Sequence, residues 1–512
     1  MPSSWLLPFS LFLISNSGSA MSLKNRTTFF RLSTNWQSIK LLLIAAIIGI
    51  SNPVVAEQPR NAPKVPAKKP NIIYVMLDDA GYGDFGAFGS KTIQTPTFDQ
   101  MCKEGLRFTH HYSGSAVCAP TRCVLLTGLH SGHCKRRDNK ATANQKEIHN
   151  GLVFLGSTDV TIGKAMHNAG YVTGGIGKWG LGNTGTSGAP DKQGFDHFYG
   201  YLDQVHAHNH YTDWLWEDGK RSEIPGNADG KKETYVHDLL EQKTFDFIET
   251  YANKDKPFFL YLPYTLPHGA YVIPHTDLAY QPYVDKNWSQ EVKNYAGMVT
   301  RADQTVGKML ELLKELNIDD DTIVFYTSDN GPNAKFAKSL ASGGPFRGTK
   351  RQLTEGGLRA AMVARWPGKI EANSKSDFAW SMVDMMPTCL DLANSDDAPP
   401  HLDGVSVLPT LLGETQTPLD YIYFEIHHPF QQAVRMGDFK GFRTGTEEPL
   451  LLYDVVNDLG EEKNIAGSHR NLVAKMKTIM KDGRTDSRYY PTVKKSKPTK
   501  KRKNNKKKAG FP

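Results

Sequence analysis

The body of the chain begins with PNIIYVMLDD, residues 70–79. The apolar run 72–77 is uninterrupted and ends in two aspartates, Asp78 and Asp79. Such a run indicates a strand that is buried on both faces, as in the parallel sheets of α/β proteins. Open α/β sheets place their functional sites at the carboxyl ends of these strands. This stretch therefore predicts both the fold class and one part of a site.

Helix and strand patterns alternate after this first strand. Helices are expected over 95–105, 161–170, 233–252 and 290–316, and strands over 106–110, 257–264 and 321–331. The alternation continues to about residue 415, which predicts one large α/β domain over 70–415 with a mixed or mainly parallel sheet between helices. Short strand-like runs and a helical run then predict a C-terminal subdomain over 416–490, formed by a small antiparallel sheet and a helix.

The N-terminus contains two apolar runs, WLLPFSLFLI (5–14) and LLLIAAIIGI (41–50). The second follows a basic region and leads into small residues before Ala56. This order predicts a signal peptide over 1–56, with Met21 as an alternative start, and then a linker over 57–69. The apolar core is short for a bilayer, and a retained membrane anchor is the alternative. We expect an exported protein, either periplasmic or secreted.

The net charge of +8 comes from the C-terminal tail. The stretch KKSKPTKKRKNNKKK (494–508) has ten basic residues and no acidic one, and subtracting them leaves −2 for the rest of the chain. A near-neutral body lacks the basic surface of nucleic-acid-binding proteins, so we expect no nucleic-acid partner. The tail, 491–512, is expected to be a disordered basic arm, which either aids solubility or adheres to polyanions.

Oxygen-bearing side chains end two of the predicted strands. Asp78 and Asp79 end the first, and Asp329 and Asn330 end the strand in DTIVFYTSDNG, residues 321–331. Taken singly, each pair fits an N-cap or a turn as well as a ligand. Two such pairs at strand ends of one domain favour a metal site. Ligation by oxygen alone suits Ca²⁺ or Mg²⁺ rather than Zn²⁺.

The stretch SAVCAPTRCVLLTG (115–128) places a cysteine at the start of an expected helix. Arg122 follows Cys118 by one helical turn, so its side chain is expected to point back toward residue 118. There it would stabilise a charged nucleophile together with the helix N-terminus. The alternative is a structural cysteine near an ion-pairing arginine. The chain has five cysteines, so disulfide pairing leaves at least one over, and which ones pair stays open.

The pattern C-x-P-x-R resembles the signature of the type I, formylglycine-dependent sulfatases, an arylsulfatase-like branch of the alkaline phosphatase-like superfamily. The resemblance extends from about residue 70 to about residue 470. Besides CAPTRCVLLTG, it rests on PNIIYVMLDD, TPTFDQMCKEGLRFTHHYSGSAVCAPTR, GYVTGGIGKWG, LPHGAY, TSDNG and FRGTKRQLTEGGLRAAMVARWPG. It implies an alkaline phosphatase-like fold and the hydrolysis of sulfate esters.

In that family the cysteine is oxidised after translation to formylglycine, and the resemblance carries this modification over to Cys118. The aldehyde hydrates to a geminal diol, of which one hydroxyl attacks the sulfur and the other loses its proton to re-form the carbonyl. The resemblance thus implies a formylglycine-generating enzyme as a maturation partner. It also adds position 118 to the ligands of one Ca²⁺, with Mg²⁺ as the alternative.

The resemblance also assigns roles to three further polar residues. Lys178 in GKWG lies near the diol and the sulfate, and Lys350 in FRGTKRQ contacts sulfate oxygens. His268 in LPHGAY protonates the departing alcohol. Taken singly, each lysine fits a surface charge, and His268 fits a loop histidine.

One position departs from the family pattern. In the family a histidine often follows GKW, where it contacts the diol and acts as a base, and this chain has Gly180 there. We expect another histidine to replace it or the aldehyde to be regenerated differently. The candidates for replacement are His133, His206, His208 and His210.

Two stretches are expected at the rim of the pocket. The stretch GFDHFYGYLDQVHAHNHYTDWLWEDGK (194–220) is dense in aromatic residues and histidines, which suit a sugar, and is expected to form a loop over the pocket. A packed loop with core aromatics is the alternative. The stretch HCKRRDN (133–139) is the second rim. The candidate substrate-binding residues are His133, Arg137, Asp138, Asn139, His206 and His208.

The leading hypothesis is an exported, calcium-dependent sulfatase that acts on a sulfated carbohydrate, such as a sulfated polysaccharide. A phosphatase or phosphodiesterase of the same superfamily is the nearest alternative, but those enzymes use serine or threonine, often with two zinc ions. A non-catalytic protein that binds sulfated glycans, with Cys118 unmodified, is the alternative from another class. The sugar, the sulfated position and the oligomeric state stay open.

Overall fold

Strand β1 (Asn71–Leu77) lies at the centre of the main sheet, and all of its residues are buried. The computed structural model describes residues 68–141 and 152–492. The expected signal peptide (1–56), most of the expected linker and the basic stretch 494–508 lie outside the described residues. The strand expected from PNIIYVMLDD is confirmed.

The main sheet is mixed, as the sequence predicts. The strands β9, β1, β8, β4 and β5 run parallel to one another, and β10 and β6 are antiparallel to the strands they join. The ten strands, in the order of the sheet, are β11 (Ser374–Ser376), β2 (Leu106–Phe108), β10 (Met362–Arg365), β9 (Thr322–Ser328), β1, β8 (Phe258–Pro263), β4 (Val172–Lys178), β5 (His197–Tyr201), β6 (Trp214–Glu217) and β7 (Lys220–Glu223).

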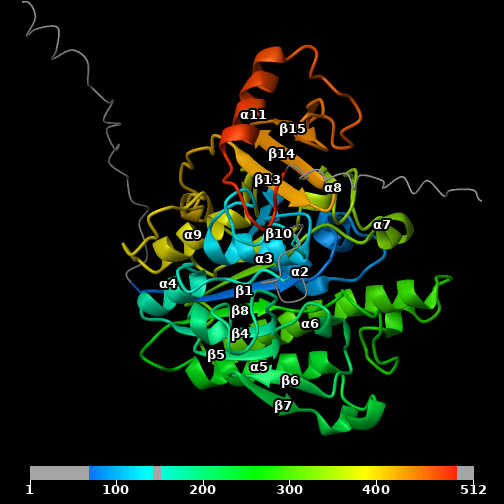
Figure 1. The fold of residues 1–512 in the computed structure, drawn as a ribbon. Helices are drawn as coiled ribbons and strands as arrows, with labels where there is room; N and C mark the ends of the chain where they lie inside the picture. The colour runs from blue at the N-terminus through cyan, green and yellow to red at the C-terminus, as the bar shows by residue number, and fades with distance from the viewer. Residues whose placement is uncertain (1–67, 142–151, 493–512) are drawn as a thin grey trace, which may run out of the picture. The chain divides into compact units, whose positions relative to one another are not determined.

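Helices cover both faces of the main sheet (Figure 1). Ile72 and Met76 of β1 pack with α3, α4 and α9 on one face, and Ile73 and Val75 pack with α2, α5 and α6 on the other. Since successive side chains of a strand point to opposite faces, covering both faces requires the uninterrupted apolar run. The helices are α2 (Pro96–Glu104), α3 (Cys118–Thr127), α4 (Ile162–Asn168), α5 (Val236–Tyr251), α6 (Gln290–Glu315) and α9 (Met385–Leu392).

A second, smaller sheet follows near the C-terminus, also as expected. It is antiparallel, and the amphipathic helix α11 (Arg470–Asp482) packs against it through Met476 and Met480 (Figure 1). Its strands are β13 (Ile422–His427), β14 (Phe430–Met436), β15 (Phe439–Arg443) and β16 (Leu451–Asp454). The remaining short elements are β3 (His111–Tyr112), which pairs with β12 (Trp380–Ser381), and the helices α7 (Ala334–Leu340), α8 (Glu355–Leu358) and α10 (Leu408–Leu411).

Residues 194–220 are not a single loop. The stretch contributes β5 and β6 to the main sheet, and only the segment between these strands, with a 3-10 turn at His206–His208, has loop character. The reason is that residues 197–201 form backbone hydrogen bonds with β4, and residues 214–217 pair with β5 in turn. The aromatic residues expected in a loop therefore lie partly in strands. We call residues 202–210 the histidine loop.

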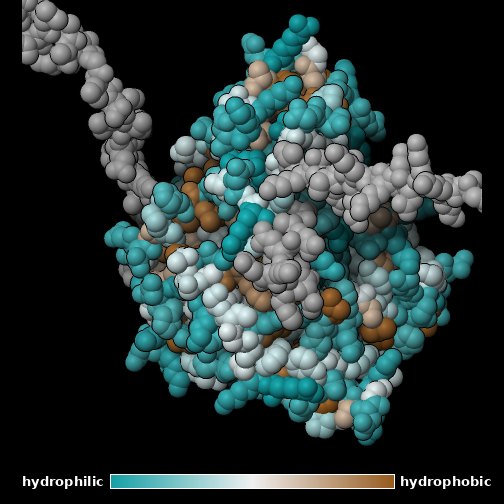
Figure 2. All heavy atoms as spheres, in the orientation of Figure 1, coloured by the Kyte–Doolittle hydropathy of each residue, from teal (hydrophilic) through white to brown (hydrophobic). Residues whose placement is uncertain are grey.

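The surface seen in Figure 2 is mostly hydrophilic, with hydrophobic residues in small separate patches. Isolated exposed apolar residues are normal for globular proteins. Among the described residues, no helix combines the length and the hydrophobicity that crossing a membrane requires.

Candidate active site

The carboxyl ends of β1 and β9 bring four oxygen-bearing side chains together. The two strands pair in parallel and end side by side, so Asp78 and Asp79 lie beside Asp329 and Asn330. The Asp79 N–H donates to Oδ1 of Asp329 (3.1 Å), and Nδ2 of Asn330 donates to Oδ1 of Asp79 (2.7 Å). All four side chains are buried. Strand pairing therefore assembles the four residues that the sequence singled out.

Asp79 has a left-handed backbone conformation, with φ of 70°. This conformation costs free energy for a residue other than glycine and is concentrated at functional sites. It interrupts the alternation of side chains that a strand imposes. As a result, the carboxylates of the consecutive residues Asp78 and Asp79 both approach the same sulfur atom, that of Cys118.

Cys118 is the first residue of α3 and is buried. Its thiol donates to Oδ1 of Asp78 (3.2 Å) and lies 3.9 Å from Oδ1 of Asp79. Burial, followed by the charge of Asp78, raises the pKa of this thiol well above its usual range. A thiol in this environment stays protonated at neutral pH and is a poor nucleophile.

Arg122 lies one turn into α3, and its guanidinium is fully buried among carboxylates. Nη2 lies 2.9 Å from Oδ2 of Asp329 and 3.4 Å from Oδ2 of Asp78. Nη1 donates to the carbonyl of Lys178 (2.7 Å). The arginine therefore ties the helix to the ends of three strands of the sheet.

Two lysines and a histidine complete the cluster. Nζ of Lys178 lies 2.5 Å from Oδ2 of Asp78. Nζ of Lys350 lies 2.6 Å from Oδ1 of Asp79 and 3.2 Å from the Cys118 sulfur. His268 is partly exposed and places Nε2 3.5 Å from Oδ2 of Asp79. The side chains of all five residues expected to be catalytic thus contact the carboxylate of Asp78 or of Asp79. These residues are Cys118, Arg122, Lys178, His268 and Lys350.

The buried carboxylates Asp78 and Asp329 have pKa values shifted in opposite directions by their surroundings. Burial alone would raise the pKa of Asp78, but Lys178, His268 and Arg122 hold it well below its usual value. Burial and the neighbouring Asp78 raise the pKa of Asp329 to about 7, although Arg122 opposes this shift. An additional positive charge beside Asp329 would offset the electrostatic repulsion between Asp329 and Asp78 and favour the ionised form of Asp329.

The oxygen ligands fit a hard divalent cation. Asp78, Asp79 and Asp329 supply three carboxylates, and Oδ1 of Asn330 is buried without a hydrogen-bond partner among the described residues. An unpaired buried amide oxygen is costly and gains free energy by coordinating a cation. Asp78, Asp79, Cys118 and His268 also place one potential ligand atom each within 4.8 Å of the others.

A second group of potential ligands, His130, His133 and Asp403, fits a metal poorly. Nδ1 of His130 accepts a hydrogen bond from the N–H of Gly132 (3.1 Å), so a neutral ring carries its proton on Nε2. Nε2 is the atom that faces Asp403, at 3.8 Å. A protonated nitrogen does not bind a metal. We therefore interpret this group as a structural contact.

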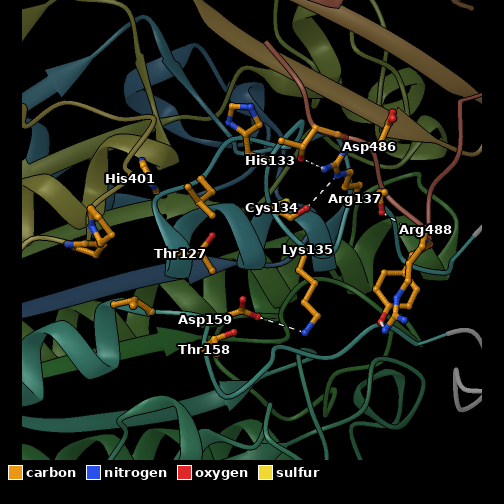
Figure 3. A pocket seen from close by; sticks show the side chains of 17 residues that line it. Thr127, His133, Cys134, Lys135, Arg137, Thr158, Asp159, His401, Asp486 and Arg488 are labelled. Carbon is orange, nitrogen blue, oxygen red and sulfur yellow. Dashed lines mark hydrogen bonds and ion pairs between the residues drawn. The ribbon is translucent and has the colours of Figure 1, made fainter. Parts of the chain in front are cut away.

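The residues of the stretch 133–139 contact different parts of the protein. His133 and Arg137 line a cavity of about 450 Å³ near the C-terminal end of α3 (Figure 3). Arg137 is buried there and pairs with Glu425. Asp138 is buried and accepts hydrogen bonds from two backbone N–H groups of the C-terminal subdomain. Asn139 accepts a hydrogen bond from the N–H of Ala119 (3.1 Å) and is the member of the stretch that contacts the start of α3.

The three histidines of the histidine loop also differ. His206 contacts Thr212 through Nε2 (2.7 Å) and packs against Trp214. His210 is buried and binds the carbonyl of His268 (2.8 Å). The His208 side chain is exposed, with its ring 4.6 Å from that of His268. Among them, His208 is the histidine whose ring lies beside the His268 ring.

Gln204 is a residue of this region that sequence reasoning missed. Its Nε2 fills the space next to Gly180, where a side chain at position 180 would begin. A glutamine followed by histidines carries no signal for this contact, because it depends on how two loops meet in space.

The described residues include all five cysteines, and all are free and buried. The Cys134 thiol donates to the carbonyl of Arg136 (3.2 Å). The cysteines other than Cys118 therefore contribute to packing in this structure.

Two family models match the chain. One, described as Sulfatase, matches residues 70–395, and the other, described as N-sulphoglucosamine sulphohydrolase, C-terminal, matches residues 347–486. The first covers the main sheet with the candidate site, and the second covers the small C-terminal sheet.

Curated proteins and solved structures agree with this assignment. The chain is 31% identical over 425 residues to N-acetylgalactosamine-6-sulfatase of Canis lupus familiaris, which covers 80% of this chain and 75% of the relative. It is 31% identical over 406 residues to an arylsulfatase of Hemicentrotus pulcherrimus, covering 75% and 69%. The crystal structure of Ps i-CgsB in complex with k-i-k-neocarrahexaose aligns with a TM-score of 0.70 and 30% identity, covering 81% of this chain and 92% of that one.

The expected fold and family are thus confirmed, with the carboxylates, cations and Cys118 gathered at the carboxyl ends of the sheet strands. The chain belongs to the sulfatase family and is a sulfuric ester hydrolase.

Proposed function

We propose that this protein hydrolyses a sulfate ester of a sulfated carbohydrate, using a formylglycine made from Cys118 and one divalent cation, Ca²⁺ or else Mg²⁺. The observation that carries the proposal is the position of Cys118. It is the first residue of α3, in contact with the carboxylates of Asp78 and Asp79 and with the ammonium of Lys350. In the proposed domain organisation, residues 70–415 form the catalytic domain and 416–490 the C-terminal subdomain.

The raised pKa of the Cys118 thiol supports the modification. A buried thiol beside carboxylates is held in its neutral form and attacks poorly. A hydrated aldehyde at this position would supply a hydroxyl as nucleophile and a route for releasing sulfate. A formylglycine-generating enzyme is then the required maturation partner.

The cation would be held by Asp78, Asp79, Asp329, Asn330 and position 118. When bound, it would supply the Lewis acidity that makes a hydroxyl at position 118 more nucleophilic. The unpaired Oδ1 of Asn330 and the raised pKa of Asp329 support this ligand set.

The surrounding cations suit a sulfate group. Arg122 is fixed by two carboxylates and the Lys178 carbonyl, so it has little freedom to move when substrate binds. Lys178 and Lys350 approach from two sides and would bind oxygens of the sulfate. Donors that are held in place before the reaction stabilise developing negative charge without reorganisation. His268, which is partly exposed and lies beside Asp79, would contact the ester oxygen and protonate the departing alcohol.

The names of the relatives support a carbohydrate as substrate. One relative is named for N-acetylgalactosamine 6-sulfate, and one solved structure contains a neocarrahexaose. The candidate substrate-binding residues remain His133, Arg137, Asp138, Asn139, His206 and His208, of which His208 lies beside His268. With the signal-peptide pattern of residues 1–56, we propose an exported enzyme, periplasmic or secreted, that acts on a glycan outside the cytoplasm.

The test is release of inorganic sulfate. The enzyme is co-expressed with a formylglycine-generating enzyme, and the aldehyde at position 118 is verified by mass spectrometry. A panel of sulfated glycans, including N-acetylgalactosamine 6-sulfate and neocarrahexaose, is then assayed by ion chromatography, with Cys118→Ala as the control. Sulfate release that the control lacks supports the proposal. Aldehyde-bearing enzyme that binds the glycans but releases no sulfate from any of them would favour a glycan-binding protein instead.

A further inference from the structure

Gly180 lies two residues after Lys178 and has no room for a side chain. Its φ is 80°, a conformation that favours glycine. A Cβ atom at this position would lie 1.9 Å from Nε2 of Gln204, far inside any permitted contact. The Gln204 amide therefore occupies the space in which a side chain at position 180 would begin.

The histidine loop is fastened to the strand ends on which the site is built. The N–H groups of Trp179 and Gly180 donate to the carbonyls of Tyr201 (2.8 Å) and Leu202 (3.1 Å). One residue further along, Oδ1 of Asp203 accepts hydrogen bonds from the N–H groups of Val205 (2.7 Å) and His206 (3.0 Å). The backbone on both sides of Gln204 is thus held by hydrogen bonds, which keeps this residue close to Gly180.

The Gln204 amide has an unsatisfied donor. Nε2 is buried and has no hydrogen-bond partner among the described residues. A buried donor without a hydrogen-bond partner costs free energy, and a ligand with an acceptor atom at this position would remove that cost. A sulfate ester, with its anionic oxygens, is an acceptor that a sulfatase site receives during turnover.

His208, on the same loop, packs against the segment that contains His268. The N–H of Ala270 donates to the His208 carbonyl (3.1 Å). Gly269 has φ of 102°, and a Cβ there would lie 2.8 Å from Cα of His208, so glycine permits the close approach. The His208 ring lies 4.6 Å from the His268 ring, and the charges acting on it include those of Lys178 and Lys350.

We propose that the histidine loop supplies the part of the sulfate-binding site that Gly180 lacks, with the Gln204 amide as a hydrogen-bond donor and His208 as the imidazole that contacts the bound sulfate ester. This inference rests on the proposed sulfatase function. Gln204 and His208 are four residues apart on one fixed turn, so a single loop delivers both groups.

Two readouts test the proposal. The first is sulfate release by aldehyde-bearing enzyme, for Gln204→Met, His208→Ala and His208→Gln. Methionine keeps the volume beside Gly180 and removes the donor, and glutamine restores a hydrogen-bonding group at 208. The matched control is His167→Ala, an exposed histidine of α4 that pairs with Asp196. Circular dichroism verifies the fold of each variant.

We expect His208→Ala to lower kcat/KM at least 100-fold and Gln204→Met about 10-fold or more. His208→Gln should recover part of the loss, and His167→Ala should match the wild type. Values for both Gln204→Met and His208→Ala within threefold of the wild type would overturn the proposal.

The second readout is binding of inorganic sulfate, measured by calorimetry on the same proteins. It does not depend on turnover, so it separates this proposal from the proposed function. Weaker sulfate binding by about 10-fold in Gln204→Met and His208→Ala supports the assignment, even if the wild type releases no sulfate from the glycans tested. Unchanged sulfate binding in both variants would refute it.

Discussion

The ammonium of Lys350 lies 3.2 Å from the sulfur of Cys118. It is also paired with both carboxylate oxygens of Asp79, at 2.6 and 2.8 Å. In the proposed mechanism, a cation that contacts both Asp79 and position 118 would stabilise negative charge that develops on a transferring sulfate. Lys350 comes from a loop more than two hundred residues after Cys118, so this contact is a product of the fold.

Replacing Lys350 should remove this stabilisation of negative charge. For Lys350→Met we expect kcat to fall about 10²- to 10³-fold, the range found when one such donor is removed. The measurement is sulfate release by enzyme whose position 118 is verified as the aldehyde in both proteins. Lys335→Met, which removes an exposed lysine paired with Glu291, is the control. A Lys350→Met enzyme with wild-type kcat would show that the lysine has no part in the reaction.

Removing the cation should lower thermal stability. A cation that binds only the folded protein stabilises it by about 2.7 kcal/mol at a concentration of 100 Kd. We therefore expect EDTA to lower the Tm of the wild type and Ca²⁺ to restore it, with Mg²⁺ as the comparison. In Asp329→Asn, which loses one ligand charge, the shift should shrink.

The control for the cation experiment is Asp482→Asn, at the end of α11 and away from the site. Its Ca²⁺-dependent shift should equal that of the wild type. A wild-type Tm that responds to neither EDTA nor added cations would contradict the assignment of a cation to this cluster.

The strands and helices that form the site could be predicted from the sequence because their signals are local. An apolar run that ends in Asp78 and Asp79 indicates a buried strand, and the same pattern recurs before Asp329. The start of a helix at Cys118 could likewise be predicted from the sequence. The pairing of β1 with β9 was not, because register depends on contacts between segments far apart in the chain.

The surroundings of the site were harder to predict. Asn139 stays a candidate for the substrate rim, and its oxygen accepts the N–H of Ala119 next to Cys118, a contact that the sequence did not indicate. Arg137, also proposed to bind substrate, is buried and pairs with Glu425, a contact that the sequence did not indicate. Arginines usually lie at the surface. Arg137 is buried because the fold brings the carboxylate of Glu425 next to it, and the sequence alone does not show this contact. The contact between Gln204 and Gly180 is of the same kind.

Asp303 should make the stability of the protein depend on pH. Its carboxylate is buried and accepts the N–H groups of Thr97 and Phe98 at the start of α2, both at 2.8 Å. Burial raises its pKa to about 7, although these hydrogen bonds oppose the shift. Below the unfolded-state pKa of about 3.9, both states are protonated and there is no penalty. Between that value and pH 7 the unfolded state ionises first, so stability falls as pH rises.

The comparison is with Asp303→Asn, which does not titrate. From pH 5 to pH 8, the free energy of unfolding of the wild type should fall by about 2–3 kcal/mol relative to the variant, at 1.36 kcal/mol per pKa unit. Urea denaturation at several pH values measures this difference. Other buried carboxylates, such as Asp384, titrate equally in both proteins and cancel. A difference that does not change with pH would show that Asp303 is ionised in the folded state.

Lys440 should be important for attaching the small C-terminal sheet to the main domain. It lies on β15, is fully buried, and places Nζ 2.9 Å from Glu355 of α8 and 2.8 Å from Glu461. Removing one partner of a buried ion pair leaves an uncompensated charge and costs about 3–5 kcal/mol. For Lys440→Met we expect a loss of unfolding free energy of this size, measured by urea denaturation.

The exposed pair Lys335–Glu291 supplies the matched control, since Lys335→Met should change stability by no more than about 1 kcal/mol. A second variant separates loss of charge balance from loss of packing. Because Glu461→Gln removes one of the charges left unpaired, Lys440→Met/Glu461→Gln should cost less than the two single changes added together. Full additivity would mean that the two residues do not interact energetically, despite the 2.8 Å between their charged atoms.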